Sequence, residues 1–195
     1  MAITSGIFSS DPKFQDRLQD SLDTLGEFIG HLKGIGLRIV LTSGSFDLIH
    51  LGHVKYLARA KALGDVLVVG VDSDEKIRSR KGPDRPLVPE GERLEMLAHQ
   101  RPVDLLFLKQ HHHERWSLLK TVRPDVLVVT EDHSYTDGDL VALRDFCGEV
   151  CVIERQADVT TSERIRQLYM HLGERLGPKL ADVLPGLIET VLKRG

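Results

Sequence analysis

The segment Gly44–His53 combines two glycines with two histidines, in the order GSFDLIHLGH. It follows an apolar, β-branched run over 38–43 and precedes apolar residues at helical spacing, which predicts a turn from a strand into a helix. Backbone N–H groups at a helix start point at one spot and attract phosphate. His50 and His53 share one face of that first helical turn. The residues therefore indicate a triphosphate site; the alternative is a structural turn whose histidines only cap the helix.

A second group of chemically useful side chains lies between residues 76 and 93. Its cations are Lys76, Arg78, Arg80, Lys81, Arg85 and Arg93. Arginine can clamp phosphate oxygens with two parallel hydrogen bonds, whereas lysine acts as a mobile point charge. A solvated charged surface has the same composition. The position directly after a predicted strand favours phosphate contact, and within the group we favour Lys81 and Arg93 over Arg78 and Arg80.

Two further segments could contact a ligand. A helix is predicted to begin at Thr160, Thr161 and Ser162, whose hydroxyl and N–H groups suit both helix capping and phosphate binding. The run His111–His113 follows a predicted strand. Adjacent histidines do not share a helical face, and a metal site needs ligands from several directions. We favour an exposed loop for this run and leave contact with an acceptor open.

The elements that must position these residues alternate along the chain. Apolar strands are predicted at 38–43, 65–71, 103–108, 126–130 and 149–153, with a polar loop at 72–89. Helices are predicted at 12–33, 51–63, 89–100, 114–122, 138–146, 161–173 and 179–193. This alternation is typical of a parallel sheet covered on both faces, with ligands at the carboxyl ends of the strands.

We therefore predict a Rossmann-like α/β fold with three α/β/α layers and a five-stranded parallel sheet, plus extra helices at both ends. Three parts are expected: an N-terminal helical extension (1–37), the α/β domain (38–173) and a C-terminal helix (174–195). That last helix has an apolar stripe that could pack on the core or on a second subunit.

Composition excludes several classes of protein. The chain has 195 residues, a formal net charge of −3 and 41% hydrophobic residues, as in a globular domain without a broad nucleic-acid surface. No apolar run approaches the roughly 18 residues that span a bilayer. The first ten residues lack the pattern of a secretory signal, and Cys147 and Cys151 can stay reduced. We expect a cytoplasmic protein.

Three motifs resemble those of the cytidylyltransferase-like nucleotidyltransferases. Ser43–His53 resembles the H-x-G-H signature of that superfamily, which contacts the nucleotide phosphates. Arg78–Pro86 with Glu92 and Arg93 resembles its basic loop and helix-start arginine. Thr160–Ile165 resembles its late S-T-[ST]-x-x-I motif. The order and spacing are most similar to the nucleotidyltransferase domain of ADP-heptose synthases and to glycerol-3-phosphate cytidylyltransferases.

The resemblance implies roles for individual residues. The implied catalytic set is His50, His53, Lys81 and Arg93. The implied nucleotide contacts are Ser43, Gly44, Ser45, Phe46, His50, Gly52, His53, Asp132, Thr160, Thr161 and Ser162. The implied acceptor contacts are Asp47, Lys81, Arg85 and Arg155. Asp132 would accept hydrogen bonds from the ribose, although Thr130 and Glu131 stand where the family carries glycine.

The implied reaction is transfer of a nucleoside monophosphate from an NTP to a phosphorylated small molecule, with release of pyrophosphate. Adenylyl transfer to a sugar phosphate similar to heptose 1-phosphate is our first expectation. Alternatives are cytidylyl transfer to glycerol 3-phosphate or ethanolamine phosphate, FMN adenylyl transfer, and a nucleotide-binding regulatory module without activity. We expect Mg²⁺ to arrive with the NTP and to need few protein ligands, and a homodimer is implied by the resemblance alone.

Overall fold

The structure is a computed structural model that describes residues 6–7, 13–131, 135–154 and 161–192. The chain divides into two compact units, Met1–Gln156 and Ala157–Gly195. The first contains the sheet and its covering helices, and the second contains one long helix. Each unit is described by itself below.

The sheet of the first unit is parallel throughout, in the order β1-β4-β3-β2-β5-β6. Its strands are β1 (Leu18–Gln19), β2 (Ile39–Gly44), β3 (Val66–Asp72), β4 (Leu105–Lys109), β5 (Val126–Thr130) and β6 (Glu149–Ile153). The α/β class and the parallel sheet are confirmed. The prediction of five strands is wrong, because the two-residue β1 adds a sixth at the edge.

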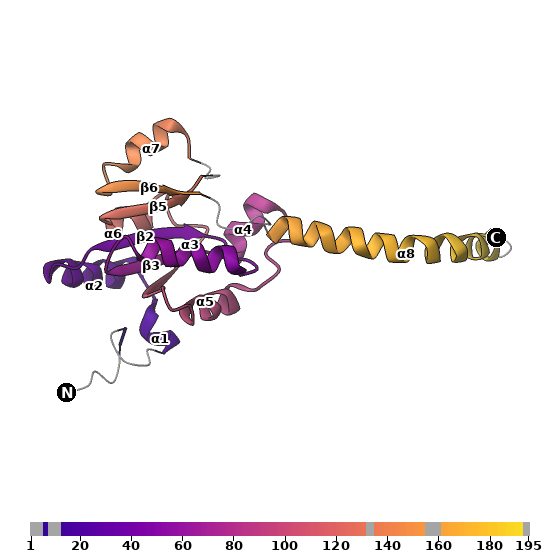
Figure 1. The fold of residues 1–195 in the computed structure, drawn as a ribbon, viewed down its shortest axis with the longest axis horizontal. Helices are drawn as coiled ribbons and strands as arrows, with labels where there is room; N and C mark the ends of the chain where they lie inside the picture. The colour runs from indigo at the N-terminus through magenta and orange to yellow at the C-terminus, as the bar shows by residue number, and fades with distance from the viewer. Residues whose placement is uncertain (1–5, 8–12, 132–134, 155–160, 193–195) are drawn as a thin grey trace. The chain divides into compact units, whose positions relative to one another are not determined.

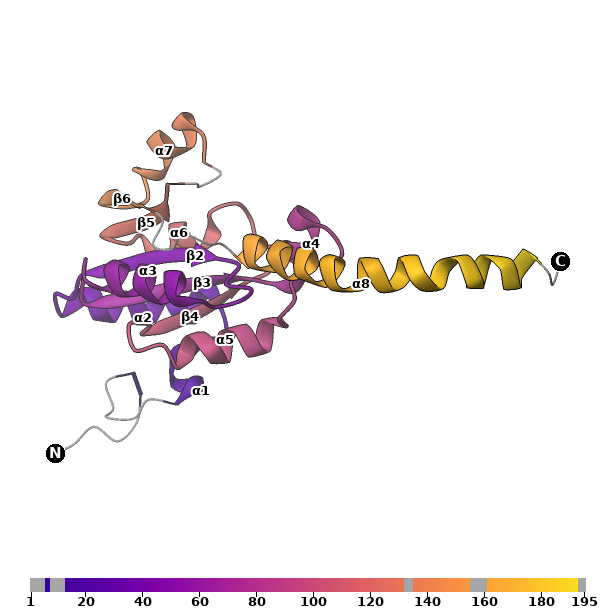
Figure 2. The same cartoon turned by 45° about the vertical axis from the view of Figure 1, so that its right-hand side comes forward.

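Helices cover both faces of this sheet (Figures 1 and 2). They are α1 (Phe14–Arg17), α2 (Leu22–Gly34), α3 (Leu51–Lys61), α4 (Asp74–Lys81), α5 (Glu90–Ala98), α6 (Ser117–Val122) and α7 (Asp137–Leu143). Side chains of α3 and α5 pack in one hydrophobic cluster, and those of α2, α6 and α7 pack in the other. Successive residues of a strand point to opposite faces, so Val40 lies in the first cluster and Leu41 in the second. The sheet thus has a buried core on each side.

The N-terminal segment differs from the single helix predicted for residues 12–33. Leu18 pairs with Leu106 at the open edge of β4, which interrupts the helical pattern. Ser21 then starts α2, because its hydroxyl accepts a hydrogen bond from the N–H of Thr24 at 3.1 Å and the two residues form a capping box. Helical spacing of apolar residues alone could not show this cap-directed break.

Two other predicted boundaries are corrected. Part of the predicted polar loop at 72–89 is helix α4, because Ser73 caps it by accepting a hydrogen bond from the N–H of Lys76 at 3.2 Å. The two predicted C-terminal helices form one continuous helix, α8 (Thr161–Leu192), that includes Pro178. A proline removes one hydrogen bond from a helix, and the neighbouring turns retain the helical path.

Apolar side chains recur along α8 and are exposed over the described stretch. They include Leu168, Leu172, Leu176, Leu180 and Leu184. Among the helices that the structure describes, none is long and apolar enough to cross a membrane.

The homodimer stays a prediction that the α8 stripe makes testable. Exposed apolar side chains in a row favour association, so light scattering should give about twice the chain mass of 21.8 kDa. Leu176→Glu should lower that mass toward the monomer, whereas Glu174→Gln on the same helix should not. A monomer at all concentrations for the unchanged chain would contradict the prediction.

Candidate active site

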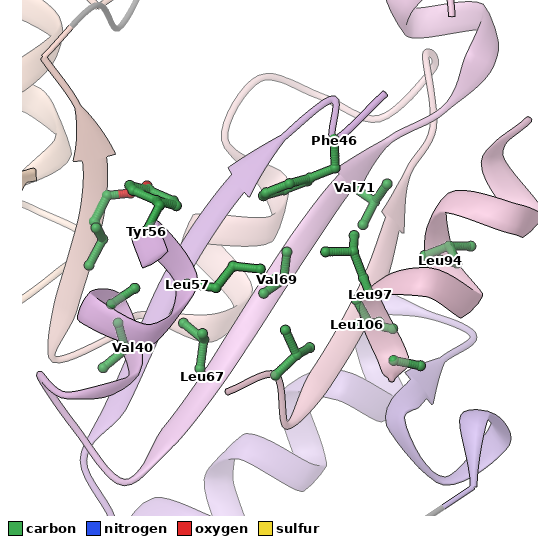
Figure 3. Packing of buried hydrophobic residues seen from close by; sticks show 14 of the residues in the cluster. Val40, Phe46, Tyr56, Leu57, Leu67, Val69, Val71, Leu94, Leu97 and Leu106 are labelled. Atoms are coloured by element: carbon green, nitrogen blue, oxygen red, sulfur yellow. The ribbon is translucent and has the colours of Figure 1, made fainter. Parts of the chain in front are cut away.

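The turn between β2 and α3 lies at the carboxyl edge of the sheet and is shaped by Phe46. Phe46 adopts a left-handed backbone conformation with φ of 47°, and its side chain is buried beside Val69 and Val71 (Figure 3). A Cβ at Gly44 would lie 3.2 Å from the Phe46 ring. A larger residue at 44 would therefore press on the ring that anchors the turn. The backbone of the turn is held close to the sheet, as a phosphate-binding turn requires.

A buried chain of hydroxyl groups fixes α3 against the sheet. The Thr42 and Tyr56 hydroxyls lie 2.6 Å apart, and the Tyr56 hydroxyl donates to the backbone carbonyl of Val128 at 3.2 Å. These three residues come from β2, α3 and β5. Buried hydroxyls that are fully hydrogen-bonded rigidify a core. The N-terminus of α3, and with it the histidine pair, is thereby held in one place relative to two strands.

His50 and His53 both turn their Nδ1 atoms toward the start of α3. His50 is the N-cap residue, and its Nδ1 accepts the N–H of Gly52 at 3.1 Å. The N–H of His50 points at Nδ1 of His53 at 3.4 Å, and the ring centroids are 4.1 Å apart. A neutral imidazole whose Nδ1 accepts carries its proton on Nε2. The helix start therefore fixes both rings as Nε2–H donors on the face predicted from the spacing.

His53 is poised as a neutral group. Its pKa is lowered from 6.5 to about 4, chiefly by burial and then by electrostatic interaction with His50 and Lys81. Near pH 7 the ring is thus an uncharged hydrogen-bond donor. The charge of Lys81, the last residue of α4, therefore acts on the His53 ring. Burial also lowers the pKa of Lys81, with Arg80 and Arg85 as the next causes.

Arg93 lies under the turn, where it is fully buried. Its Nε donates to the carbonyl of Val88 at 2.9 Å, and its Nη1 donates to the carbonyl of Ser45 at 2.5 Å. Its Nη2 donates to the carbonyl of Asp72 at 2.9 Å and to Oδ1 of Asp74 at 2.7 Å. These contacts connect the turn to the end of β3 and the start of α5. Direct contact of Arg93 with a triphosphate stays a prediction.

Asp47 connects the turn to the segment that follows α4. One carboxylate oxygen accepts the N–H groups of Leu87 and Val88 at 2.8 and 3.0 Å. The other forms an ion pair with Arg85 at 2.8 Å. Asp47 is buried, and the side chain of Arg85 is only 16% exposed. Both were predicted to bind the acceptor; here they bind each other, and the acceptor role stays a prediction.

A cavity of about 220 Å³ opens at the same edge, on the sheet face covered by α6. Its lining includes Ser43, Lys76, Arg80, Lys109, His113, Glu114, Arg115, Trp116 and Tyr135. Apolar residues of the α6-side core, among them Leu41 and Leu118, form its floor. Ser43, near the end of β2, therefore lines this cavity. The histidine pair lies at the start of α3, whose side chains pack on the other face of the sheet.

The cations of the cavity surround one buried carboxylate. Asp72 forms ion pairs with Arg80 at 2.5 Å and with Lys109 at 3.2 Å, and its side chain is 4% exposed. Burial raises the pKa of Asp72, but Lys109 and Arg80 lower it more, so the net shift is downward. Burial lowers the pKa of Lys76, as do Lys109 and Arg80. The cavity thus gathers several cations around the buried carboxylate of Asp72.

Sequence reasoning did not assign these cavity residues to the site. Arg80 was set aside in favour of Lys81 and Arg93, and Lys109 lay one residue beyond a predicted strand. The available signal was position, since Asp72 and Lys109 both end parallel strands at the edge where ligands gather.

Other predicted residues lie elsewhere. His113 lines the cavity, its ring stacked on Phe107 with centroids 5.6 Å apart, whereas His111 and His112 are exposed. Within the described ranges, no group of three or more His, Cys, Asp or Glu residues could hold a metal ion. Asp132, Arg155 and Thr160 fall outside the described residues. Thr161 and Ser162 begin α8, as a helix start was predicted there.

The family model described as cytidylyltransferase-like matches residues 41–175. This chain belongs to the cytidylyltransferase-like family. Among its relatives is the bifunctional protein HldE of a Nitratiruptor species, 42% identical over 134 residues, 67% of this chain and 28% of that protein. HldE of Citrifermentans bemidjiense is 40% identical over 129 residues, 66% of this chain and 25% of that protein. The chain thus spans about a quarter of the length of these relatives.

Solved structures give the same fold. The lipopolysaccharide core biosynthesis protein of Thermoplasma volcanium superimposes with a TM-score of 0.56 at 29% identity, over 63% of this chain and all of that one. A pantoate–β-alanine ligase of Francisella tularensis superimposes with a TM-score of 0.52 at 16% identity, over 73% of this chain and 68% of that one. The second likeness concerns the fold alone.

The lowered pKa of His53 predicts a pH-dependent loss of stability. Between pH 6.5 and about 4, the unfolded chain binds a proton at His53 and the folded chain does not, so the free energy of unfolding should fall as the pH is lowered through this window. Urea denaturation at pH 7, 5.5 and 4 measures it. His53→Gln removes the titrating group, so its stability should fall less. Equal losses in both proteins would contradict the assignment.

Arg93→Met should destabilise the fold. The substitution leaves three carbonyls and the Asp74 carboxylate without their donor, and breaking such a buried pair costs roughly 3 kcal/mol. For a domain of this size the melting temperature should fall by about 10 °C, as calorimetry would measure. Arg59→Met, at an exposed position of α3, is the matched control. A melting temperature unchanged by Arg93→Met would show that the network contributes little.

Proposed function

We propose that this chain transfers the adenylyl group of ATP to a sugar phosphate and releases pyrophosphate. The observation that carries the proposal is the histidine pair at the N-terminus of α3, whose Nδ1 atoms both face backbone N–H groups and of which His53 is neutral near pH 7. Such an arrangement binds phosphate oxygens without itself accepting a proton. Membership of the cytidylyltransferase-like family supports the same class of reaction.

The reaction needs no protein nucleophile. An oxygen of the acceptor phosphate attacks the α-phosphorus of ATP, and the bond from that phosphorus to the oxygen bridging to the β-phosphorus breaks. Pyrophosphate leaves with the bonding electrons, and no proton must be removed from an acceptor phosphate that is already ionised. Catalysis then depends on positioning and on stabilising charge on the phosphoryl oxygens.

The residues of the turn would supply that stabilisation. His50 and His53 donate from Nε2, and the backbone N–H groups at the start of α3 add the positive end of the helix dipole. The charge of Lys81, which acts on His53, would stabilise the negative charge of the departing pyrophosphate. Preorganised donors of this kind cost no reorganisation during the reaction, because the hydroxyl chain below α3 already holds them.

Mg²⁺ would accompany the triphosphate and neutralise part of its charge. Asp47 and Asp72, the buried carboxylates beside the turn, are already paired with cations. The donor set therefore suits a metal ion held mainly by phosphate oxygens and water, which is the ordinary way in which proteins hold Mg²⁺.

The cavity under α6 suits the acceptor. Three of its cations, Lys76, Arg80 and Lys109, can bind a phosphate, and Trp116 adds an aromatic side chain to the same lining. The choice of ATP and a sugar phosphate follows the similarity to HldE proteins and the resemblance of the motifs to ADP-heptose synthases.

Pyrophosphate release tests the proposal. The chain is incubated with ATP or CTP and, in turn, a panel of sugar 1-phosphates, glycerol 3-phosphate, ethanolamine phosphate and FMN. ATP with a sugar 1-phosphate should give the highest rate. His53→Ala should fold normally and lose on the order of 10²-fold or more in kcat, whereas His31→Ala at an exposed site on α2 should not.

Other outcomes assign other functions. Highest activity with CTP and glycerol 3-phosphate would replace the proposed substrates and keep the reaction. ATP binding without pyrophosphate from any acceptor would contradict catalysis and favour a regulatory module. Full activity of His53→Ala would remove the histidine pair from the mechanism.

A further inference from the structure

We propose that Arg80 is a catalytic residue shared by the two halves of the site: it binds the acceptor phosphate in the cavity under α6 and, from the same guanidinium, contacts the phosphate-binding turn. This inference rests on the proposed nucleotidyl transfer and adds to it the group that brings the acceptor phosphate and the triphosphate together. It also assigns Asp72 as the residue that positions Arg80.

The first support is the location of the guanidinium. Nη2 of Arg80 lies 3.4 Å from the hydroxyl of Ser45 in the turn and 2.5 Å from Oδ2 of Asp72. Arg80 also lines the cavity, together with Ser43 from the end of β2. The turn that precedes the histidine pair and the cavity under α6 therefore meet at this side chain.

The second support is the uneven use of the donors of Arg80. Among the described residues, both of its hydrogen bonds start at Nη2. Its side chain is 49% exposed, so Nη1 and Nε remain accessible to a ligand. The planar fork of arginine suits two oxygens of one phosphate. Arg93 differs on both counts, because it is fully buried and its three nitrogens donate to protein acceptors.

The third support is the charge balance of the cavity. Lys76, Arg80 and Lys109 surround Asp72, the one buried carboxylate among them, and Glu114 and Arg115 add one charge of each sign at the lining. Arg115 is itself paired with Asp139 at 2.7 Å. Lys76, Arg80 and Lys109 thus exceed the charge of Asp72 by two, and a net positive charge of one remains when Glu114, Arg115 and Asp139 are counted as well, which favours an anionic ligand. Oppositely charged neighbours at close range are worth most in partly buried sites.

Asp72 would set the spacing of the two cations that it contacts. Its Oδ2 holds Arg80 at 2.5 Å, its Oδ1 holds Lys109 at 3.2 Å, and β3 fixes its backbone. Asp72 does not need to touch the acceptor for this role. It holds Arg80 toward the turn rather than out into solvent, which makes it a positioning residue.

The experiment compares kinetic constants for ATP and the active acceptor in three variants. Arg80→Ala should lower kcat on the order of 10²-fold and raise the acceptor KM by roughly 10-fold, as expected for a lost charged hydrogen bond, with little change in the ATP KM. Lys109→Ala, which removes a cavity cation that pairs with Asp72 but makes no hydrogen bond to the turn among the described residues, should raise the acceptor KM and leave kcat within a few-fold. Arg78→Ala, exposed on the same helix, should change neither.

A double-mutant cycle tests the role of Asp72. If Asp72 acts through Arg80, Asp72→Asn lowers kcat on its own but lowers it no further in the Arg80→Ala background. A merely structural role for Asp72 would give additive losses and a lower melting temperature instead. Arg80→Ala with unchanged kcat and acceptor KM, or a loss in Arg78→Ala equal to that in Arg80→Ala, would overturn the proposal.

A binding measurement separates this proposal from the proposed function. Trp116 lines the cavity and is the single tryptophan of the chain, so its fluorescence should report inorganic phosphate entering the cavity, with KCl at matched ionic strength as the control. If the chain releases no pyrophosphate from any acceptor, the proposed function fails. Phosphate binding weakened in Arg80→Ala but not in Arg78→Ala would still support the phosphate contact, and equal binding in both would contradict it.

Discussion

The buried guanidinium of Arg93 joins the segments that meet at the carboxyl edge of the sheet in the first unit. Moving the charge of Arg93 out of water is costly unless hydrogen bonds replace its hydration, and here the replacements are the carbonyls of Ser45, Asp72 and Val88 with the carboxylate of Asp74. Each acceptor belongs to a different part of the edge. Satisfying one side chain therefore holds the turn, the end of β3 and the segment before α5 in a single arrangement.

Asp47, which is negatively charged, holds the same segment through a second set of hydrogen bonds. Its carboxylate binds the N–H groups of Leu87 and Val88, while Arg93 binds the carbonyl of Val88. In the segment before α5, two backbone N–H groups are therefore bound by Asp47 and one backbone carbonyl is bound by Arg93. These contacts hold the hydrogen-bond donors of the site in place before a ligand binds. Electrostatic stabilisation is most effective when the donors are preorganised in this way.

The site uses two kinds of polar group, each suited to its place. Beside the turn, desolvation keeps His53 neutral, so it donates a hydrogen bond without presenting a charge. In the cavity, Asp72 allows Lys76, Arg80 and Lys109 to lie together although like charges repel. The histidine pair would then stabilise negative charge on the triphosphate, and the cavity cations would stabilise it on the acceptor phosphate at the other face of the sheet. Arg80 lies where these two regions meet.

Most of the fold could be predicted because its signals are local. The five long strands are continuous apolar runs, and α3 and α5 have apolar residues at helical spacing, so their positions were predicted within a few residues. The missed elements depend on side-chain caps or on pairing at a distance. Ser73 and Ser21 begin α4 and α2 through single hydrogen bonds, and β1 exists because Leu18 reaches the open edge of β4.

By itself, the sequence determined the turn between β2 and α3, because glycine and histidine at fixed spacing act through the backbone of one strand–helix unit. Only the tertiary structure decided which of the many cations line the cavity and which are buried. Arg80 and Arg93 are thirteen residues apart and chemically alike, yet one lies at the cavity and the other is buried under the turn. The burial of a side chain and its hydrogen-bond partners depend on how distant strands and helices pack together, so they cannot be predicted from the residue type alone.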